Sequence, residues 1–374
     1  MAAAKNVLVT GGCGFVGSHL VDALVAQGHH VRVLDNLDPQ VHGDKAPDYL
    51  HPDAELLRGE IQDPGAVSNA LRGIDVVFHL AAAVGVGQSM YEISRYVGTN
   101  AQGTAVLLQA LLRRPSKVTK LIIASSMSIY GEGKYACEKC GDVAPPLRSV
   151  QQLQNREWEL NCLKCGSHLE PIPTDESKSL QCSSIYALSK KDQEEMSLLF
   201  GRTYKLPVVA LRYFNIYGPR QALSNPYTGV AAIFASRLLN GNPPLVFEDG
   251  RQLRDFVGIN DIVRANILAM DNSGGDGKAL NIGSGQPISI FEVAGVLGRA
   301  LHTSIDCELT EKYRAGDIRH CFADISAARA CLGYKPEVQF SNGVKDLVEW
   351  LQSQKPTDRV VEAFAQLNSF GLAA

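Results

Sequence analysis

The sequence predicts a doubly wound α/β fold, in which helices cover both faces of a parallel sheet. Two observations predict it: short apolar runs of strand length, and helical segments that alternate with them along the chain. The run Asn6–Thr10 is of the apolar kind expected for a strand that is buried on both faces. At 374 residues the chain exceeds one typical domain, so we expect two lobes around a shared cleft.

A glycine-rich loop follows this first strand and leads into a segment with helical periodicity. Three of its glycines, Gly11, Gly14 and Gly17, are spaced three residues apart. Glycines at this spacing allow a tight turn and a close approach of backbone to a pyrophosphate at a helix amino terminus. An ordinary turn would explain the glycines alone, but the strand–loop–helix order favours a dinucleotide-binding site.

The second predicted strand, His30–Leu34, ends at Asp35. An acidic residue at this place accepts hydrogen bonds from the ribose hydroxyls of adenosine and repels a phosphate attached there. The sequence therefore predicts NAD and not NADP.

The alternation continues through the next part of the chain. A hydroxyl at the carboxyl end of such a strand, as at Ser126, lies where open parallel sheets bind ligands. The further predicted strands are 75–79, 121–126 and 207–211, and the helices span about 101–112 and 186–200.

Tyr186 and Lys190 are four residues apart in one of these helices. This spacing puts both side chains on one helix face, about one turn apart. A phenol with a pKa near ~10 is a poor base at neutral pH, but a neighbouring ammonium favours the phenolate. Such a pair can take a proton from a hydroxyl group during hydride transfer. The same spacing also arises by chance, so this interpretation depends on the dinucleotide loop.

Four of the nine cysteines form two matching pairs, Cys137-Glu-Lys-Cys140-Gly and Cys162-Leu-Lys-Cys165-Gly. The spacing lets both thiolates of a pair reach one ion, and the glycine lets backbone amides turn toward sulfur. Disulfides, which the cytosol disfavours, and free thiols with coincidental spacing are the alternatives. The pairs predict a four-thiolate zinc site, structural because no coordination position stays open.

Composition argues against several classes of partner. The net charge is −3 with mixed signs, which does not favour nucleic acid or an anionic membrane surface. Residues 1–5 have no leader-like pattern before the first strand, and no apolar run is long enough to span a bilayer. We therefore expect a cytoplasmic protein.

Together, an ordered set of motifs resembles one known family, the extended short-chain dehydrogenase/reductases. More narrowly, the chain resembles the NAD-dependent nucleotide-sugar epimerases and dehydratases, over about residues 5–350 apart from the cysteine insertion. The resemblance implies a Rossmann fold for the doubly wound part. The motifs are Gly11–Gly17, Ser126–Gly131, Tyr186–Lys190, Arg212–Arg220, Glu248–Phe256, Asn281–Gly285 and Arg314–Arg319.

The resemblance also implies roles for individual residues. Ser126, Tyr186 and Lys190 would be catalytic, while Ser126, Asn215, Arg254 and Arg314 would hold a nucleotide-diphosphate sugar, with the arginines on its diphosphate. Taken alone, the two arginines would be ordinary surface charges. The residues implied along NAD are Gly11, Gly14, Phe15, Val16, Gly17, Asp35, Asn36, Glu60, Ile61, Leu80, Ala81, Ala82, Asn100, Tyr186, Lys190 and Phe214.

The activity implied is inversion of a sugar carbon through a transient 4-keto intermediate. Dehydratases of the family carry an acid pair directly after the serine or threonine, whereas Met127 and Ser128 stand here, so 4-epimerisation is favoured. The stretch Ala83–Met90 and the cysteine insertion are similar to bacterial dTDP-L-rhamnose 4-epimerases, which implies interconversion of dTDP-L-rhamnose and dTDP-6-deoxy-L-talose. The alternatives are a UDP-glucose or UDP-uronic acid 4-epimerase, a 4,6-dehydratase, a reductase, a decarboxylase, or a non-catalytic regulator that binds NAD or a sugar nucleotide.

The predicted domain boundaries follow from these assignments. Residues 1–134, 178–221 and 252–283 would form the NAD-binding domain, 135–177 a zinc-ribbon insertion, 222–251 and 284–352 a smaller α/β substrate lobe, and 353–374 a carboxyl-terminal helix and tail. In this tail the apolar face of an amphipathic helix, 357–367, would consist of Val360, Val361, Phe364 and Leu367. The family often dimerises through helices near 101–112 and at Tyr186, which implies a homodimer.

Overall fold

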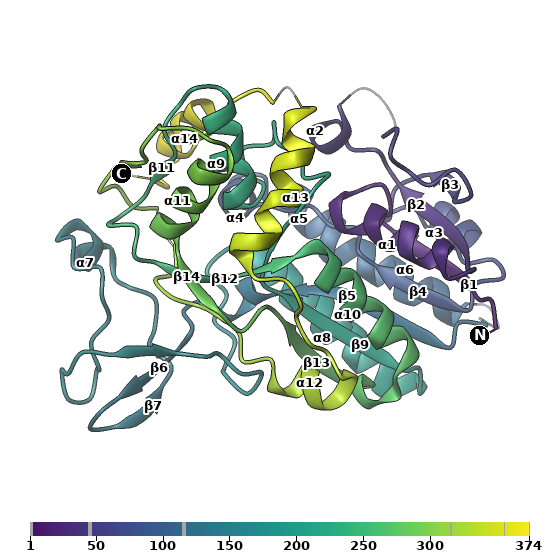
Figure 1. Cartoon of the computed structure of the whole chain (residues 1–374). Coiled ribbons are helices and arrows are strands. Elements are labelled where there is room, and N and C mark those ends of the chain that lie inside the picture. Colours follow the sequence, from purple (N-terminus) through teal and green to yellow (C-terminus); the bar gives the residue numbers. More distant parts are fainter. Residues whose placement is uncertain (1–2, 44–46, 114–116, 315, 355, 374) are drawn as a thin grey trace.

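A computed structural model describes residues 3–43, 47–113, 117–314, 316–354 and 356–373. Its centre is a sheet of β1 (Asn6–Thr10), β2 (His30–Asp35), β3 (Glu55–Arg58), β4 (Val76–His79), β5 (Lys120–Ser126), β9 (Val208–Tyr213) and β13 (Lys278–Ile282). The seven strands lie in the order β13-β9-β5-β4-β1-β2-β3 (Figure 1). Every neighbouring pair is parallel, which confirms the predicted fold class.

Helices cover both faces of this sheet because successive side chains of each strand point to opposite faces. In β1, Val7 and Val9 pack in one core cluster, with helices α1 (Phe15–Ala26), α10 (Ile259–Asp271) and α12 (Ser326–Leu332). Leu8 packs in the other cluster, with α3 (Pro64–Ala70), α6 (Gly103–Leu112) and α8 (Ile185–Tyr204). The continuous apolar runs of the sequence therefore serve two cores at once.

A smaller lobe lies beyond the carboxyl ends of the strands. It contains β10 (Asn215–Tyr217), β12 (Leu253–Gly258) and β14 (Pro287–Ser289), in which β12 pairs parallel with β10 and antiparallel with β14. The pair β11 (Leu245–Val246) and β15 (Glu308–Leu309) is parallel. Helices α9 (Val230–Leu239), α11 (Ile290–Ala300) and α13 (Phe340–Gln352) pack around a core of their own.

The cysteine-bearing segment projects from the side of the molecule that lies away from the amino terminus (Figure 1). It forms an antiparallel sheet of β6 (Lys134–Cys137), β7 (Gly141–Val143) and β8 (Glu170–Ile172), together with α7 (Val150–Gln154). Its small core contains Tyr135, Leu160 and Leu169 beside the cysteines.

The carboxyl-terminal helix is α14 (Val360–Ser369), which begins and ends slightly later than the predicted range 357–367. Val361 does not belong to its apolar face, because 67% of that residue is exposed. The buried side chains are Ala363 and Leu367. On this face Ala363 takes the place of Val361 against the body.

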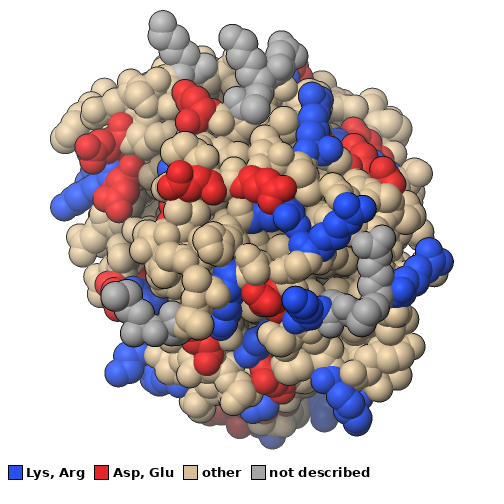
Figure 2. Space-filling view, turned by 90° about the vertical axis from the view of Figure 1, so that its right-hand side faces the viewer, with Lys and Arg blue, Asp and Glu red and all other residues tan. Residues whose placement is uncertain are grey.

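Short elements connect these parts: α2 (Pro39–His42), α4 (Val86–Ser89), α5 (Ile93–Tyr96), the π-helix η1 (Val97–Gln102) and the 3-10 helices η2 (Met127–Tyr130) and η3 (Ser273–Gly275). Among the helices of the described ranges, none has both the length and the apolar character needed to cross a bilayer. Acidic and basic side chains lie next to each other across the face shown in Figure 2.

Candidate active site

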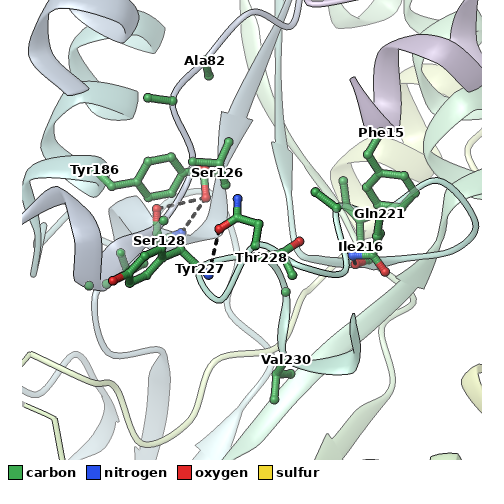
Figure 3. A pocket seen from close by; sticks show the side chains of 18 of the residues that line it. Phe15, Ala82, Ser126, Ser128, Tyr186, Ile216, Gln221, Tyr227, Thr228 and Val230 are labelled. Carbon is green, nitrogen blue, oxygen red and sulfur yellow. Dashed lines mark hydrogen bonds between the residues drawn. The ribbon is translucent and has the colours of Figure 1, made fainter. Parts of the chain in front are cut away.

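A cavity of about 660 Å³ lies at the carboxyl edge of the parallel sheet and extends into the smaller lobe. Parallel strands all end at this edge, so the segments that follow them converge there. The cavity is lined by every residue predicted to hold the dinucleotide or the sugar nucleotide except Asn100. Figure 3 shows part of it, with Tyr186 and Ser126 on one side and Phe15 and Ile216 on the other.

The glycine loop packs too tightly for side chains. Gly11 has a φ of +70°, and a Cβ atom there would lie 2.8 Å from the backbone nitrogen of Ala81. A Cβ atom on Gly17 would lie 2.2 Å from the carbonyl oxygen of Gly11. The amino terminus of α1 therefore sits directly on the strand ends, with its first amide groups free to face an anion.

Asp35 closes this loop from the end of β2. Its carboxylate accepts hydrogen bonds from the backbone amides of Cys13, at 3.0 Å, and Leu37, at 2.9 Å. Next to it, the Asn36 amide donates to Glu60 at 3.2 Å. Asp35, Asn36 and Glu60, all predicted to lie along NAD, therefore line the cavity together.

Asn100 has an indirect position. It is fully buried in η1, accepts from the backbone amide of Ala83 at 2.8 Å and donates to the carbonyl oxygen of Ala83 at 3.0 Å. Its second donor hydrogen goes to Ser189 at 2.9 Å. This side chain fixes the segment after β4 against α8, and it does not itself line the cavity.

Tyr186 and Ser126 meet at the wall of the cavity. Burial raises the pKa of Tyr186, and a hydrogen bond with Ser126 acts in the opposite direction. The Ser126 oxygen accepts from the Ser128 amide at 3.2 Å and from the Ser128 hydroxyl at 2.9 Å, as the dashed lines in Figure 3 show. Because both lone pairs of Ser126 are engaged, its own hydrogen is available to the tyrosine oxygen.

The Lys190 ammonium is held by acceptors on the sheet and on its own helix. The lysine is buried, and its ammonium donates to the carbonyl oxygen of Ala124 at 2.6 Å and to Gln193 Oε1 at 2.7 Å. Burial lowers the pKa of Lys190 to about 7.

The predicted substrate residues lie on the lobe side of the cavity. The Arg254 guanidinium donates to the carbonyl oxygens of Leu253, Ile318 and Arg319 at 2.7–2.9 Å. Arg314 pairs with Asp317 at 2.8 Å and lies over the Phe247 ring, 4.7 Å from its centroid.

Asn215 lies close to the end of β9, on the strand β10. Its Oδ1 atom is buried, and within the described ranges no donor reaches it. A buried acceptor without a donor is costly, so this atom is suited to a hydroxyl or amide of a ligand.

Sequence reasoning missed several residues that line the cavity. Tyr227, Phe247 and Gln252 come from loops of the smaller lobe, and Phe364 and Leu367 come from α14. For Phe364 and Leu367 the signal was the apolar face predicted for the carboxyl-terminal helix, which indicated packing against the body and not a cavity wall.

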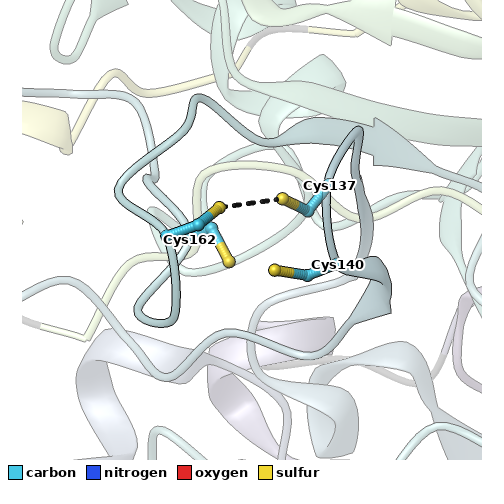
Figure 4. A group of neighbouring side chains, drawn as sticks. Cys137, Cys140 and Cys162 are labelled. Carbon is cyan, nitrogen blue, oxygen red and sulfur yellow. Dashed lines mark hydrogen bonds between the residues drawn. The ribbon is translucent and has the colours of Figure 1, made fainter.

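The four paired cysteines come together in the insertion (Figure 4). Their sulfur atoms all lie within 4.8 Å of one another, and those of Cys137 and Cys165 are 3.4 Å apart. Backbone amides of Cys165 and Lys164 lower the pKa of Cys162, and hydrogen bonds from Ser167 lower that of Cys165 to about 6. The donor set fits one tetrahedral ion of the kind that four thiolates bind.

Comparisons with known proteins agree with this architecture. The model of the NAD dependent epimerase/dehydratase family matches residues 7–150 and 164–283. A dTDP-L-rhamnose 4-epimerase from Burkholderia thailandensis is 33% identical over 94% of this chain and 96% of its own length. A UDP-glucose 4-epimerase from Mycolicibacterium smegmatis is 30% identical over 93% of this chain and 99% of its own.

Solved structures give the same result. The crystal structure of a UDP-glucose 4-epimerase with UDP-glucose from Thermotoga maritima has a TM-score of 0.76 at 32% identity, covering 93% of this chain and 98% of the other. A UDP-glucuronic acid 4-epimerase from Bacillus cereus, in complex with UDP-glucuronic acid and NAD, also has a TM-score of 0.76, at 27% identity and coverage of 93% and 99%.

The family model and the full-length relatives therefore confirm the resemblance on which the sequence interpretation depended. The chain belongs to the NAD-dependent epimerase/dehydratase family, within the extended short-chain dehydrogenase/reductases, and is an enzyme of that family.

Proposed function

We propose that this enzyme is an NAD-dependent nucleotide-sugar 4-epimerase. The observation that carries the proposal is the hydrogen-bonded pair of Ser126 and Tyr186 in a cavity that also contains the glycine loop. A phenol beside a dinucleotide site is positioned to exchange a proton with a sugar hydroxyl. NAD, when bound, would supply a reversible acceptor for the hydride of the sugar carbon.

The residues that support NAD binding form one wall. Gly11 and Gly17 let the amino terminus of α1 approach the strand ends, where the amides of α1 can hold a pyrophosphate. Asp35 stands where ribose hydroxyls would bind.

Tyr186 would take the proton from the hydroxyl on the reacting carbon, and Ser126 would hydrogen-bond the same oxygen. Lys190 lines the same cavity, and burial lowers its pKa to about 7, so it would supply or hold a proton there near neutral pH. The arginines Arg254 and Arg314 would hold the diphosphate, because guanidinium groups match phosphate oxygens in pairs. With the diphosphate held, the keto sugar could turn its other face toward the cofactor.

The residues after Ser126 favour epimerisation over dehydration. Met127 has no titratable group, and the Ser128 hydroxyl donates to Ser126. Neither residue can serve as the general acid or base that removal of water requires. The residues at positions 127 and 128 therefore support epimerisation, in which hydride returns to the carbon that it left.

For the substrate we propose the pair dTDP-L-rhamnose and dTDP-6-deoxy-L-talose. The Burkholderia relative, whose name gives dTDP-L-rhamnose, supports this choice. UDP-glucose and UDP-glucuronic acid are the competing substrates, named for relatives of comparable coverage. The experiment is incubation of the purified enzyme with a panel of dTDP- and UDP-sugars, followed by NMR of the products. Accumulation of a 4-keto-6-deoxy sugar, with no inverted centre, would replace the epimerase with a dehydratase.

We also propose that the cysteine cluster holds a structural zinc ion, supported by four sulfur atoms that lie within 4.8 Å of one another. Reduced thiols in such a site are compatible with a cytoplasmic location.

A homodimer through α8 and the helices near residues 101–112 is the proposed assembly. The exposed apolar side chains Ile93, Val97, Leu188 and Leu199 support it. Light scattering on the eluting protein would test it, since a monomer mass would contradict the proposal.

A further inference from the structure

We propose that the cysteine-bearing insertion positions the arginines of the diphosphate subsite, with Glu159 and Arg148 as its two contacts. The inference rests on the proposed function only in taking Arg254 and Arg314 as ligands of a diphosphate. The insertion thereby becomes part of the apparatus that binds the nucleotide, although none of its cysteines lies in the cavity.

The first contact is a carboxylate on a buried guanidinium. Glu159, in the insertion, accepts from Arg319 Nε at 3.0 Å and Nη2 at 2.5 Å. The Arg319 side chain is fully buried and also pairs with Glu248 and Asp249 of the smaller lobe. A buried, fully paired arginine holds its backbone in one place, because any shift would leave a desolvated charge without its partner.

Glu159 also holds His320. The ring Nδ1 of His320 accepts from the backbone amide of Leu253 at 3.1 Å. That bond places the ring hydrogen on Nε2, which lies 3.1 Å from the other Glu159 oxygen and donates to it. One carboxylate therefore fixes two consecutive residues, and through the second it fixes the amino end of β12.

These backbone segments accept the hydrogen bonds of Arg254. Its guanidinium donates to the carbonyl oxygens of Leu253 at 2.8 Å, Ile318 at 2.7 Å and Arg319 at 2.9 Å. Two of these acceptors belong to residues that Glu159 holds directly or through His320. Glu159 is thus connected to Arg254, which we propose binds the diphosphate, through the side chain of Arg319 or His320 and one backbone segment.

The second contact reaches Arg314 from a different direction. Arg148, in the insertion, donates to both oxygens of Glu248 at 2.8–2.9 Å, and both side chains are almost fully buried. Glu248 follows Phe247, the ring on which the Arg314 guanidinium lies. A planar, two-bond pair resists rotation more than a single bond does, so Arg148 fixes the loop that carries this ring.

The test measures binding of UDP and of dTDP by calorimetry, separately from turnover. In Glu159→Gln the side chain keeps its size, and Arg319 keeps its other carboxylates. We expect the dissociation constant to rise about fivefold to tenfold, with bound NAD unchanged and kcat within about twofold of wild type. Arg148→Lys, which cannot make the two-bond pair, should raise the dissociation constant by about threefold or more. Arg148→Lys also provides an independent test if Glu159→Gln does not fold.

Arg156→Ala is the matched control. Arg156 also joins the insertion to the smaller lobe, through an ion pair with Glu311, but both side chains are exposed and neither lines the cavity. We expect this variant to bind as wild type does. If folded Glu159→Gln and Arg148→Lys bind the nucleotides with wild-type affinity, the inference is wrong while the proposed activity stands. If the wild-type enzyme itself binds neither nucleotide, the proposed function is wrong and the inference falls with it.

Discussion

The hydroxyl of Ser128 donates a hydrogen bond to the hydroxyl of Ser126 across 2.9 Å. The Ser128 amide adds a second bond to the same oxygen, so Ser126 is left with one free hydrogen, which it can offer to Tyr186. Ser128, at a position where the resemblance implies an acid in dehydratases, thus orients a neutral donor. This direction of donation stabilises a phenolate without supplying a proton for the loss of water.

Replacing Tyr186 by phenylalanine removes the proposed base and keeps the ring. We expect the rate of sugar interconversion to fall by about a hundredfold to ten-thousandfold, because proton transfer by a positioned side chain contributes that much. Bound NAD should be retained, which absorbance of the released nucleotide would measure. Tyr204→Phe, at the exposed end of the same helix, is the control and should behave as wild type. Unchanged turnover in Tyr186→Phe would favour the non-catalytic regulator.

Lys190 makes stability depend on pH. Burial lowers its pKa from 10.5 to about 7, so the folded state gives up this proton at a lower pH than the unfolded state does. The cost of burying the ammonium is therefore fully present below pH 7 and is relieved as the pH rises toward 10.5. The stability advantage of Lys190→Met over wild type should shrink by about 1–3 kcal/mol between about pH 7 and pH 9.

Urea unfolding at each pH would measure this difference. Lys191→Met is the control, because the Lys191 ammonium pairs with Glu195 near the surface. Its curve should keep a nearly constant distance from that of wild type in the same interval. Parallel curves for Lys190→Met and wild type would contradict the lowered pKa.

Loss of one cysteine of the cluster should release the proposed zinc. We expect wild type to carry about one zinc per chain and Cys162→Ser much less by elemental analysis, since four-thiolate sites need all of their ligands. The melting temperature should fall as well, because the small core around Tyr135, Leu160 and Leu169 is too small to fold by itself. Cys182→Ser, outside the cluster, should keep the metal. A metal-free wild type with full activity would remove the zinc proposal.

The strands that could be predicted from the sequence are those that are buried on both faces of the sheet. β1, β2 and β5 were visible as apolar runs, whereas β3 and β13 were not recognised as strands of the sheet. Both of the missed strands lie at the sheet edges, where one side is not covered by a neighbour and polar residues are tolerated.

Site residues at the carboxyl end of a strand, such as Ser126 and Asp35, could be predicted because parallel strands end at one edge. Glu159 and Arg148 could not, since they reach the site through contacts with residues far along the chain. The orientation of the Lys190 ammonium could not be predicted from the helix spacing either, because it depends on acceptors at Ala124 and Gln193.

The carboxyl-terminal helix supplies the last prediction, because it forms part of the cavity wall. The Phe364 ring lines the cavity, lies 5.8 Å from the Phe247 ring and has the Lys312 ammonium 5.0 Å from its centroid. Phe247 in turn supports Arg314. Phe364→Ala should therefore weaken nucleotide-sugar binding by about threefold to tenfold, through loss of apolar contact and of support for Phe247. Val361→Ala, on the exposed face of the same helix, should leave the affinity unchanged. Equal affinities for the two variants would mean that α14 packs beside the substrate without contributing to its binding.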